Sequence, residues 1–320
     1  MNNLYLGIDT SCYTTSLCLV DDTGALVWEK RKVLEVPPGK RGLMQSNMVF
    51  QHTKNIPVLA EMIPKSLAFR NRIAAVTATV SPRREETSYM PAFLPGHSYG
   101  RTLASLLQVP LYEISHQENH IFAALQSFPE WIGQSFCAMH LSGGTTDVLY
   151  IQPAEKGLDI KQIGGSMDIS AGQLIDRVGV ALQLPFPAGP HAEALFSPEI
   201  PWREELLRFT VRAGYVSLAG PEAQLQRMIR QGSYSREEIV SYTFELLYRA
   251  LKKMIKQTFL QTSLPCCIAV GGVMANHYLR NALADYVMQN GRQFKTAPIM
   301  YSSDNALGAA FYGYWKSTRG

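Results

Sequence analysis

Two stretches far apart in the chain share one pattern: "LGIDTSCYTTSLCLV" at residues 6–20 and "MHLSGGTTDVLYI" at residues 139–151. Each has an apolar strand, a short turn that carries Thr with Asp or Gly-Gly, and a second apolar strand. Each then passes through an Asp- or Gly-bearing turn into a third strand. We interpret the stretches as two copies of one hairpin. Because the repeat distance is long, it predicts a duplicated lobe and not a solenoid.

The rest of the chain alternates buried strands with helical patterns, which is typical of an α/β protein with mixed sheets. Further strands are predicted at 72–81, 111–115 and 267–272. Helices are predicted at 51–68, 96–110, 169–184, 191–196, 236–262, 276–290 and 303–317.

Two lobes that each begin with such a hairpin indicate the two-lobed actin-like ATPase fold, with duplicated mixed β-sheet lobes flanked by helices. In that fold the hairpin turns hold phosphates through backbone N–H groups. A third Gly-Gly turn, "VGGVMAN" at 270–276, follows a predicted strand and supports this interpretation. We predict an N-terminal lobe of residues 1–113 completed by the C-terminal helix 303–320, a C-terminal lobe of residues 114–302, and a ligand cleft between them.

Composition limits the class of protein. The chain has 320 residues, 46% hydrophobic and 18% charged, as is ordinary for a soluble globular protein. No apolar run approaches the roughly 20 residues of a membrane helix, and the N-terminus lacks the basic start of a signal peptide. The five cysteines are odd in number and irregularly spaced, which fits free thiols in a reducing cytoplasm. A net charge of +4 permits an RNA partner without demanding one.

The segment "ISHQENHIFAA" at 114–124 places His116 and His120 four residues apart, on one face of a helix. They are either two metal ligands or two polar or capping histidines. A metallopeptidase site of the H-E-x-x-H type is disfavoured, because Glu118 does not directly follow His116. A sugar or acid kinase of the same fold would need a general-base aspartate, and the sequence singles out none.

Six motifs in order resemble one family over nearly the whole chain, the tRNA N6-threonylcarbamoyladenosine transferases (TsaD), also described as glycoproteases. The matching segments are "LGIDTSC", "GRTLASLLQVPLYEISHQENH", "LSGGTTDV", "SMDISAGQLIDRVGVALQLPFPAGP", "AVGGVMANHYLR" and "SSDNALGAA".

The resemblance implies a reaction and its cofactors. The exocyclic amine of adenosine 37 in the tRNA anticodon loop attacks the carbamoyl carbon of threonylcarbamoyl-adenylate, and AMP leaves. A weak amine nucleophile needs an activated carbonyl, which a metal ion can supply. The resemblance assigns one iron or zinc ion to His116, His120 and Asp304. It also implies an adenylate-type ligand (threonylcarbamoyl-AMP, or ATP, ADP or AMP), tRNA and further subunits of a modification complex as partners, and it leaves a dimer open.

Ligand-binding positions follow from the same resemblance. They are His140, Leu141, Ser142, Gly143, Gly144, Asp176, Gly189 and Asn276, with Asp9, Ser11 and Tyr13 as first-turn contacts. Plainer alternatives exist for several of them. Asp304 and Asn276 could be helix N-caps, Asp176 could be a solvated helix carboxylate beside an arginine, and Gly189 could be an ordinary turn residue.

The chain also departs from the family pattern. Tyr13 and Thr14 stand where the family has acidic residues, Thr145 replaces a histidine, and Gln173 replaces a glutamate. The loop at 81–100 is unusual and includes four consecutive charged residues. These departures give an alternative to the transferase: a diverged non-catalytic or regulatory paralogue that binds adenine nucleotide and partner proteins.

Overall fold

The computed structural model describes residues 3–11, 13–36, 43–67, 71–84, 88–154 and 157–318. The chain forms two compact units. Unit 1 consists mainly of Met1–Ile132 and Ser303–Gly320, and unit 2 of Gly133–Ala154 and Leu158–Ser302. The expected lobe boundary lay after residue 113. The observed division comes later because helix α3 (His116–Leu125) packs against the C-terminal helix of unit 1.

Unit 1 contains a five-stranded sheet in the order β3-β2-β1-β4-β5. Its strands are β1 (Leu4–Asp9), β2 (Thr14–Asp21), β3 (Leu26–Val33), β4 (Ile73–Ser81) and β5 (Leu111–Ser115). β1 and β2 are antiparallel, as are β2 and β3, whereas β1, β4 and β5 run parallel. β1 is buried along its whole length, as expected for a central strand covered on both faces.

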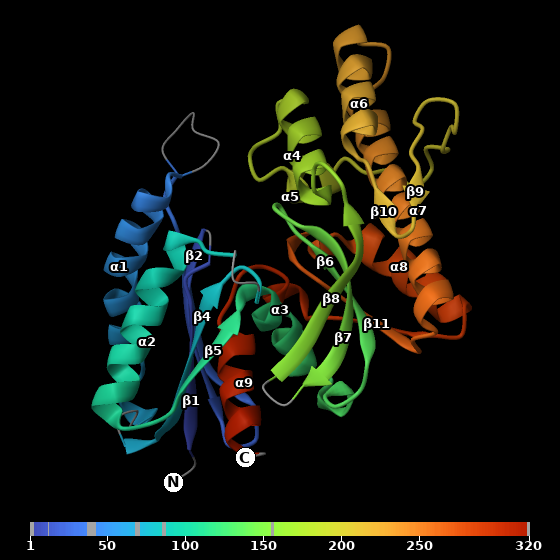
Figure 1. Ribbon diagram of the computed structural model, residues 1–320. Helices are drawn as coiled ribbons and strands as arrows, with labels where there is room; N and C mark the ends of the chain where they lie inside the picture. Colours follow the sequence, from blue (N-terminus) through green and yellow to red (C-terminus); the bar gives the residue numbers. More distant parts are fainter. Residues whose placement is uncertain are drawn as a thin grey trace. The chain divides into compact units, whose positions relative to one another are not determined.

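Helices cover both faces of this sheet. They are α1 (Gln45–Glu61), α2 (Leu94–Leu107), α3 and α9 (Leu307–Thr318). In Figure 1, α1 and α2 lie on one side of β1 and β4, and α3 and α9 lie on the other. The chain therefore returns to unit 1 at its C-terminus, and this brings the segment before α9 close to α3.

Unit 2 contains a seven-stranded sheet in the order β12-β11-β6-β7-β8-β10-β9. Its strands are β6 (Phe136–Leu141), β7 (Thr146–Ala154), β8 (Gly157–Ser166), β9 (Val211–Arg212), β10 (Tyr215–Val216), β11 (Cys266–Val270) and β12 (Gln293–Thr296). Its helices are α4 (Ala171–Ala181), α5 (Gly189–Glu193), α6 (Ala219–Gln231), α7 (Arg236–Thr262) and α8 (His277–Gln289).

The two sheets repeat one topology. In unit 2 the order β8-β7-β6-β11-β12 corresponds to β3-β2-β1-β4-β5 in unit 1, with antiparallel pairing of the hairpin and parallel pairing beyond it. The predicted duplication and the α/β class are confirmed. The short β9–β10 hairpin extends the sheet of unit 2 alone.

Each unit has its own hydrophobic core. In unit 2, Cys137 and Cys267 are buried free thiols on adjacent strands, and Cys18 is buried and free in unit 1. Cys12 lies outside the described residues. Among the helices of the described ranges, none combines the length and apolar character that a membrane span requires.

Candidate metal centre

A capping box determines where α3 begins. The Ser115 hydroxyl accepts the backbone N–H of Glu118 (3.2 Å), and the Glu118 carboxylate accepts the Ser115 N–H (2.9 Å). The helix therefore starts at His116, and His120 follows one turn later on the same face. Glu118 is fully buried and also pairs with Arg84 (2.7 Å), so its carboxylate is committed to structure.

The segment that carries Asp304 is held from three directions. Ser16 in β2 accepts the N–H of Ala306 (2.9 Å), and Arg31 in β3 donates to the Ser303 hydroxyl (2.9 Å). Ser16 and Arg31 are directly opposite each other in the antiparallel pair. From α3, the Asn119 side chain donates to the carbonyl of residue 305 (2.6 Å). These bonds join parts of the chain that are 186 to 290 residues apart.

Asp304 does not cap the last helix, so the N-cap alternative is wrong. α9 begins at Leu307, whose N–H donates to the Asn305 side chain (2.9 Å), and the N–H of Ala309 donates to Asn119 (2.8 Å). Two amide side chains thus satisfy the helix start. The carboxylate of Asp304 is left to face α3.

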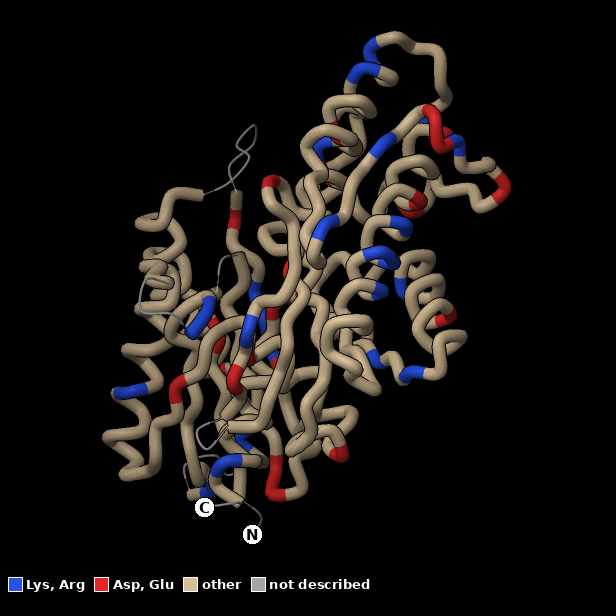
Figure 2. The backbone as a smooth tube through the Cα atoms, turned by 45° about the vertical axis from the view of Figure 1, so that its right-hand side comes forward, with Lys and Arg blue, Asp and Glu red and all other residues tan. Residues whose placement is uncertain are grey.

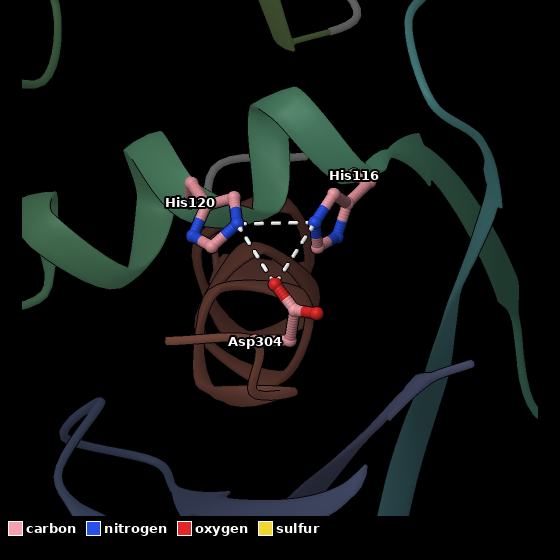
Figure 3. A group of neighbouring side chains, drawn as sticks. All are labelled: His116, His120 and Asp304. Atoms are coloured by element: carbon pink, nitrogen blue, oxygen red, sulfur yellow. Dashed lines mark hydrogen bonds and ion pairs between the residues drawn. The ribbon is translucent and has the colours of Figure 1, made fainter. Parts of the chain in front are cut away.

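The three predicted ligands lie together within unit 1. Figure 3 shows His116 and His120 on successive turns of α3, both directed toward the Asp304 carboxylate. The two Nε2 atoms lie 3.0 Å apart, and Asp304 Oδ1 lies 3.4 Å from His116 Nε2 and 3.5 Å from His120 Nε2. We refer to these residues as the His–His–Asp cluster. Among the described residues, it is the group of His, Cys, Asp or Glu side chains whose ligand atoms lie close enough together to hold one metal ion.

These spacings fit a shared metal ion. Ligand atoms that each lie about 2.0–2.2 Å from one ion are separated by roughly 3.0–3.5 Å in octahedral or tetrahedral geometry. All three observed separations fall in this range. Two imidazoles with one carboxylate suit iron or zinc and leave further positions open.

The electrostatics favour the ligand forms of two members. Burial opposes ionisation of Asp304, yet hydrogen bonds with His116 and His120 and their charges hold its pKa well below the usual value. Burial and the neighbouring His116 lower the pKa of His120. For His116, burial acts downward, but the Asp9 and Asp304 carboxylates outweigh it and raise the pKa well above normal. An ionised carboxylate and a neutral imidazole are the forms that coordinate metals.

The three predicted first-turn contacts occupy different environments. Asp9 and Ser11 are completely buried, whereas Tyr13 is exposed. The Ser11 hydroxyl donates to Asp9 Oδ2 (2.7 Å), and Asp9 Oδ2 lies 3.5 Å from His116 Nδ1. Asp9 therefore faces the back of the cluster and is closed to solvent.

The predicted nucleotide residues all belong to unit 2. The β6–β7 turn packs on the start of α4: Gly172 donates its N–H to the Ser142 carbonyl (3.2 Å), and the Ser170 hydroxyl donates to the Gly143 carbonyl (2.7 Å). The Ser142 hydroxyl accepts the N–H groups of Gly144 (3.3 Å) and Thr145 (3.0 Å). His140 and Leu141 are buried in β6, so the side chain of Leu141 contacts the core.

Asp176 and Asn276 each have a structural partner. Asp176 Oδ1 accepts the N–H of Ala188 (2.8 Å), next to Gly189 at the start of α5. Asn276 Oδ1 accepts the N–H of Leu279 (2.8 Å) and is the N-cap of α8, as its plainer alternative predicted. The cap uses only the oxygen of this amide.

One departure from the family pattern has a structural explanation. Gln173 forms a capping box with Ser170 at the start of α4: Gln173 Oε1 accepts the Ser170 N–H (3.3 Å), and the Ser170 hydroxyl accepts the Gln173 N–H (3.0 Å). Because Gln and Glu both serve at this capping-box position, the change preserves the helix start.

The duplicated sheets define a two-lobed protein with the actin-like ATPase fold, and the His–His–Asp cluster is a candidate metal centre in its first unit. Solved structures support the fold. The (R)-2-hydroxyglutaryl-CoA dehydratase component A of Acidaminococcus fermentans has a TM-score of 0.55 at 15% identity and covers 99% of both chains. A ROK family glucokinase from Streptomyces griseus has a TM-score of 0.54 at 11% identity, covering 99% of this chain and 100% of the glucokinase.

Residues 48–311 match the family model described as TsaD, tRNA N6-adenosine threonylcarbamoyltransferase, and the chain belongs to this family. A tRNA N6-adenosine threonylcarbamoyltransferase from Carboxydothermus hydrogenoformans is 28% identical over 326 residues, covering 100% of this chain and 94% of the relative. The chain is accordingly an enzyme of the acyltransferase class. The predicted ligand cleft between the lobes stays a prediction.

Proposed function

We propose that the chain transfers a threonylcarbamoyl group from threonylcarbamoyl-adenylate to the N6 amine of adenosine 37 in the tRNA anticodon loop. The observation that carries the proposal is the convergence of His116, His120 and Asp304 at metal-ligand spacing in a member of this family. These residues would hold one iron or zinc ion, which when bound polarises the carbamoyl oxygen as a Lewis acid.

Three glycines of unit 2 support an adenylate-type ligand. Gly143, Gly144 and Gly189 do not have positive φ angles, and a Cβ added to any of them would meet no atom within 4 Å. Neither backbone conformation nor packing therefore requires glycine at these positions. Close approach of a ligand to the backbone would require it, as at phosphate-binding turns.

Two side chains of unit 2 have capacity left for such a ligand. Asp176 uses Oδ1 for the Ala188 amide, and its second oxygen could accept a ribose hydroxyl. The Nδ2 atom of Asn276 is buried and has no hydrogen-bond partner within the described ranges. A buried amide donor without a partner costs free energy unless a ligand or water accepts from it.

A cationic stripe on α7 supports tRNA as the partner. It consists of Arg249, Lys252, Lys253 and Lys256, spaced i, i+3, i+4 and i+7 and hence on one helix face. Lys253 lies over the Phe209 ring (4.5 Å) and Lys252 over Tyr286 (4.8 Å), which holds the amines along the surface. Several blue Lys and Arg segments lie along the helical part of unit 2 (Figure 2). Phosphate backbones bind such basic faces. Other subunits of a modification complex and a cytoplasmic location belong to the same proposal.

The experiment combines purified full-length chain, Zn²⁺ or Fe²⁺, threonylcarbamoyl-adenylate and a tRNA transcript, with and without the partner subunits of a related enzyme. Mass spectrometry of the digested tRNA measures threonylcarbamoylation. We expect modification by the wild type and a loss of at least about 100-fold in His120→Ala, because one of three ligands is removed.

His97→Ala is the matched control. His97 lies on α2 in unit 1 and pairs with Glu113 on β5. It is not a member of the His–His–Asp cluster. Wild-type protein that binds metal and nucleotide yet leaves the tRNA unmodified in every combination would contradict the proposal and support a non-catalytic paralogue.

A further inference from the structure

We infer that Asp9 is a positioning residue that orients the ring of His116 from behind and thereby raises the affinity of the His–His–Asp cluster for its metal ion. The inference rests on the metal role proposed above. It replaces the expectation that Asp9 contacts the ligand itself, because its side chain is completely buried.

The carboxylate of Asp9 is held in place by hydrogen bonds from residues other than His116. Thr79 in β4 donates its hydroxyl to Oδ1 (2.6 Å), and Ser11 donates its hydroxyl to Oδ2 (2.7 Å) and its N–H to Oδ1 (3.3 Å). Asp9 is the last residue of β1, paired with Ser16 across the hairpin. The orientation of this carboxylate is therefore set by strand and turn.

The ring of His116 lies between two carboxylates. Its Nδ1 is 3.5 Å from Asp9 Oδ2, and its Nε2 is 3.4 Å from Asp304 Oδ1. The ring of Phe93 packs edge-on against the imidazole, with centroids 6.3 Å apart. The nitrogen on the Asp9 side points away from the cluster, and the opposite nitrogen points into it.

The order of these groups is that of a carboxylate–histidine–metal triad, with Asp9 Oδ2 at ion-pair distance from His116 Nδ1 and the metal expected on the Nε2 side. A neutral imidazole carries one proton, and a carboxylate beside Nδ1 favours the tautomer with the proton there, which leaves the Nε2 lone pair free for a metal. The buried carboxylate of Glu118, which is on α3 itself, is committed to Ser115 and Arg84 and cannot play this part. Partners of this kind typically contribute 10- to 100-fold to metal affinity.

Asp9→Asn tests the inference. The amide is isosteric and can still accept from Thr79 and the Ser11 N–H through its oxygen. Its NH₂ group would face His116 Nδ1 and favour the wrong tautomer. We expect Zn²⁺ affinity, measured by competition with a chromogenic chelator, to fall by about 10- to 100-fold. We also expect the visible spectrum of the Co²⁺-loaded protein to change, which a purely structural loss of stability would not produce.

Thr79→Val is the matched control. It removes one hydrogen bond to the same carboxylate but leaves the Asp9 charge beside His116. It is expected to lower the urea midpoint while keeping Zn²⁺ affinity within about threefold of wild type. Equal losses of affinity in both variants, or none in Asp9→Asn, would overturn the role of Asp9.

A measurement on wild-type protein covers the case in which Asp9→Asn does not fold. With ¹⁵N-histidine labelling of the Zn²⁺-loaded chain, His116 should show a protonated Nδ1 and a metal-bound Nε2, assigned by the signal lost in His116→Gln. A metal-bound Nδ1 contradicts the inference. The proposed metal role fails separately if His116→Ala binds Zn²⁺ as tightly as wild type.

Discussion

The β1–β2 turn of unit 1 and the β6–β7 turn of unit 2 occupy equivalent places in the duplicated sheets. They differ in the number of residues between the last paired positions and in solvent exposure. Asp9 pairs with Ser16, so six residues separate the last paired positions, whereas Leu141 pairs directly with Thr146 across four. Thr10 and Ser11 are fully buried, while Gly143 and Gly144 are exposed.

The bonding of the two turns explains the difference. In unit 1, Thr10 accepts the N–H of Gly96 from α2 (3.2 Å), and Asp9 is held by neighbouring hydroxyls, so the turn is closed by its own unit. In unit 2, Ser142 satisfies two backbone N–H groups and leaves the glycine faces open. One copy is buried beside the His–His–Asp cluster, whereas the other is exposed, as its proposed contact with a ligand requires.

Glycine-to-alanine changes should separate the two units most sharply. Gly308 in α9 lies against α3, and a Cβ there would collide with the Asn119 carbonyl and the Ala123 N–H, which are backbone atoms that cannot move aside. We expect Gly308→Ala to lower the free energy of unfolding by about 2–3 kcal/mol and to abolish tight Zn²⁺ binding, because α3 and α9 carry the cluster. Urea unfolding and chelator competition measure both. Wild-type stability in this variant would show that the helices pack less closely than described.

In unit 2 the same substitution should affect binding and not folding. Gly143→Ala adds a Cβ to open space, so the free energy of unfolding should change by less than about 0.5 kcal/mol. If a ligand approaches this backbone, calorimetric affinity for AMP or ADP should fall about tenfold, which corresponds to about 1.4 kcal/mol. Gly220→Ala, where a Cβ also meets open space in α6, is the control. Unchanged affinity in Gly143→Ala would place the nucleotide elsewhere.

The sequence predicted the repeated hairpins well because strand alternation and glycine turns are local signals. It also predicted α7 at its observed bounds, because helical periodicity is likewise a local signal. The predicted helix at 51–68 is observed as α1 at Gln45–Glu61. α6 and β12 were not predicted, nor were β9 and β10, which have only two residues each. α6 buries Pro221, Leu225 and Met228, which are spaced i, i+4 and i+7 as on one helix face, so a helical signal was present and was missed.

The supports of the candidate metal centre were not predictable from sequence. Asn119, Ser16 and Arg31 hold the Asp304 segment through contacts over 186 or more residues, and no local pattern marks such pairs. An amide between two histidines on a largely apolar helix was the one available hint for Asn119. The burial of Asp9 likewise depends on β4, because Thr79 bonds it from the neighbouring strand.

Asp176→Asn should give the smallest effect and the clearest sign. Burial raises the pKa of Asp176, and the Ala188 N–H offsets this only in part. The folded chain therefore holds this proton to higher pH than the unfolded chain, whose carboxyl has a pKa of about 3.9. The stability that the protonated Asp176 carboxyl contributes is fully present below the unfolded pKa and is lost as pH rises through the folded pKa. Asparagine keeps an acceptor for Ala188 and cannot ionise.

The variant should therefore gain stability over wild type as pH rises from about 4 to 7, as measured by urea midpoints across this range. If stability depends on pH in the same way in both proteins, burial does not raise the pKa of the Asp176 carboxyl. Affinity for AMP should move the opposite way at pH 7, since the ionised oxygen is the proposed ribose acceptor. If the protein is more stable without the Asp176 charge but binds nucleotide less tightly, then the same carboxylate opposes folding and favours binding. That competition would mark unit 2 as the ligand-binding half, whereas Asp9→Asn in unit 1 should impair metal binding without a gain in stability.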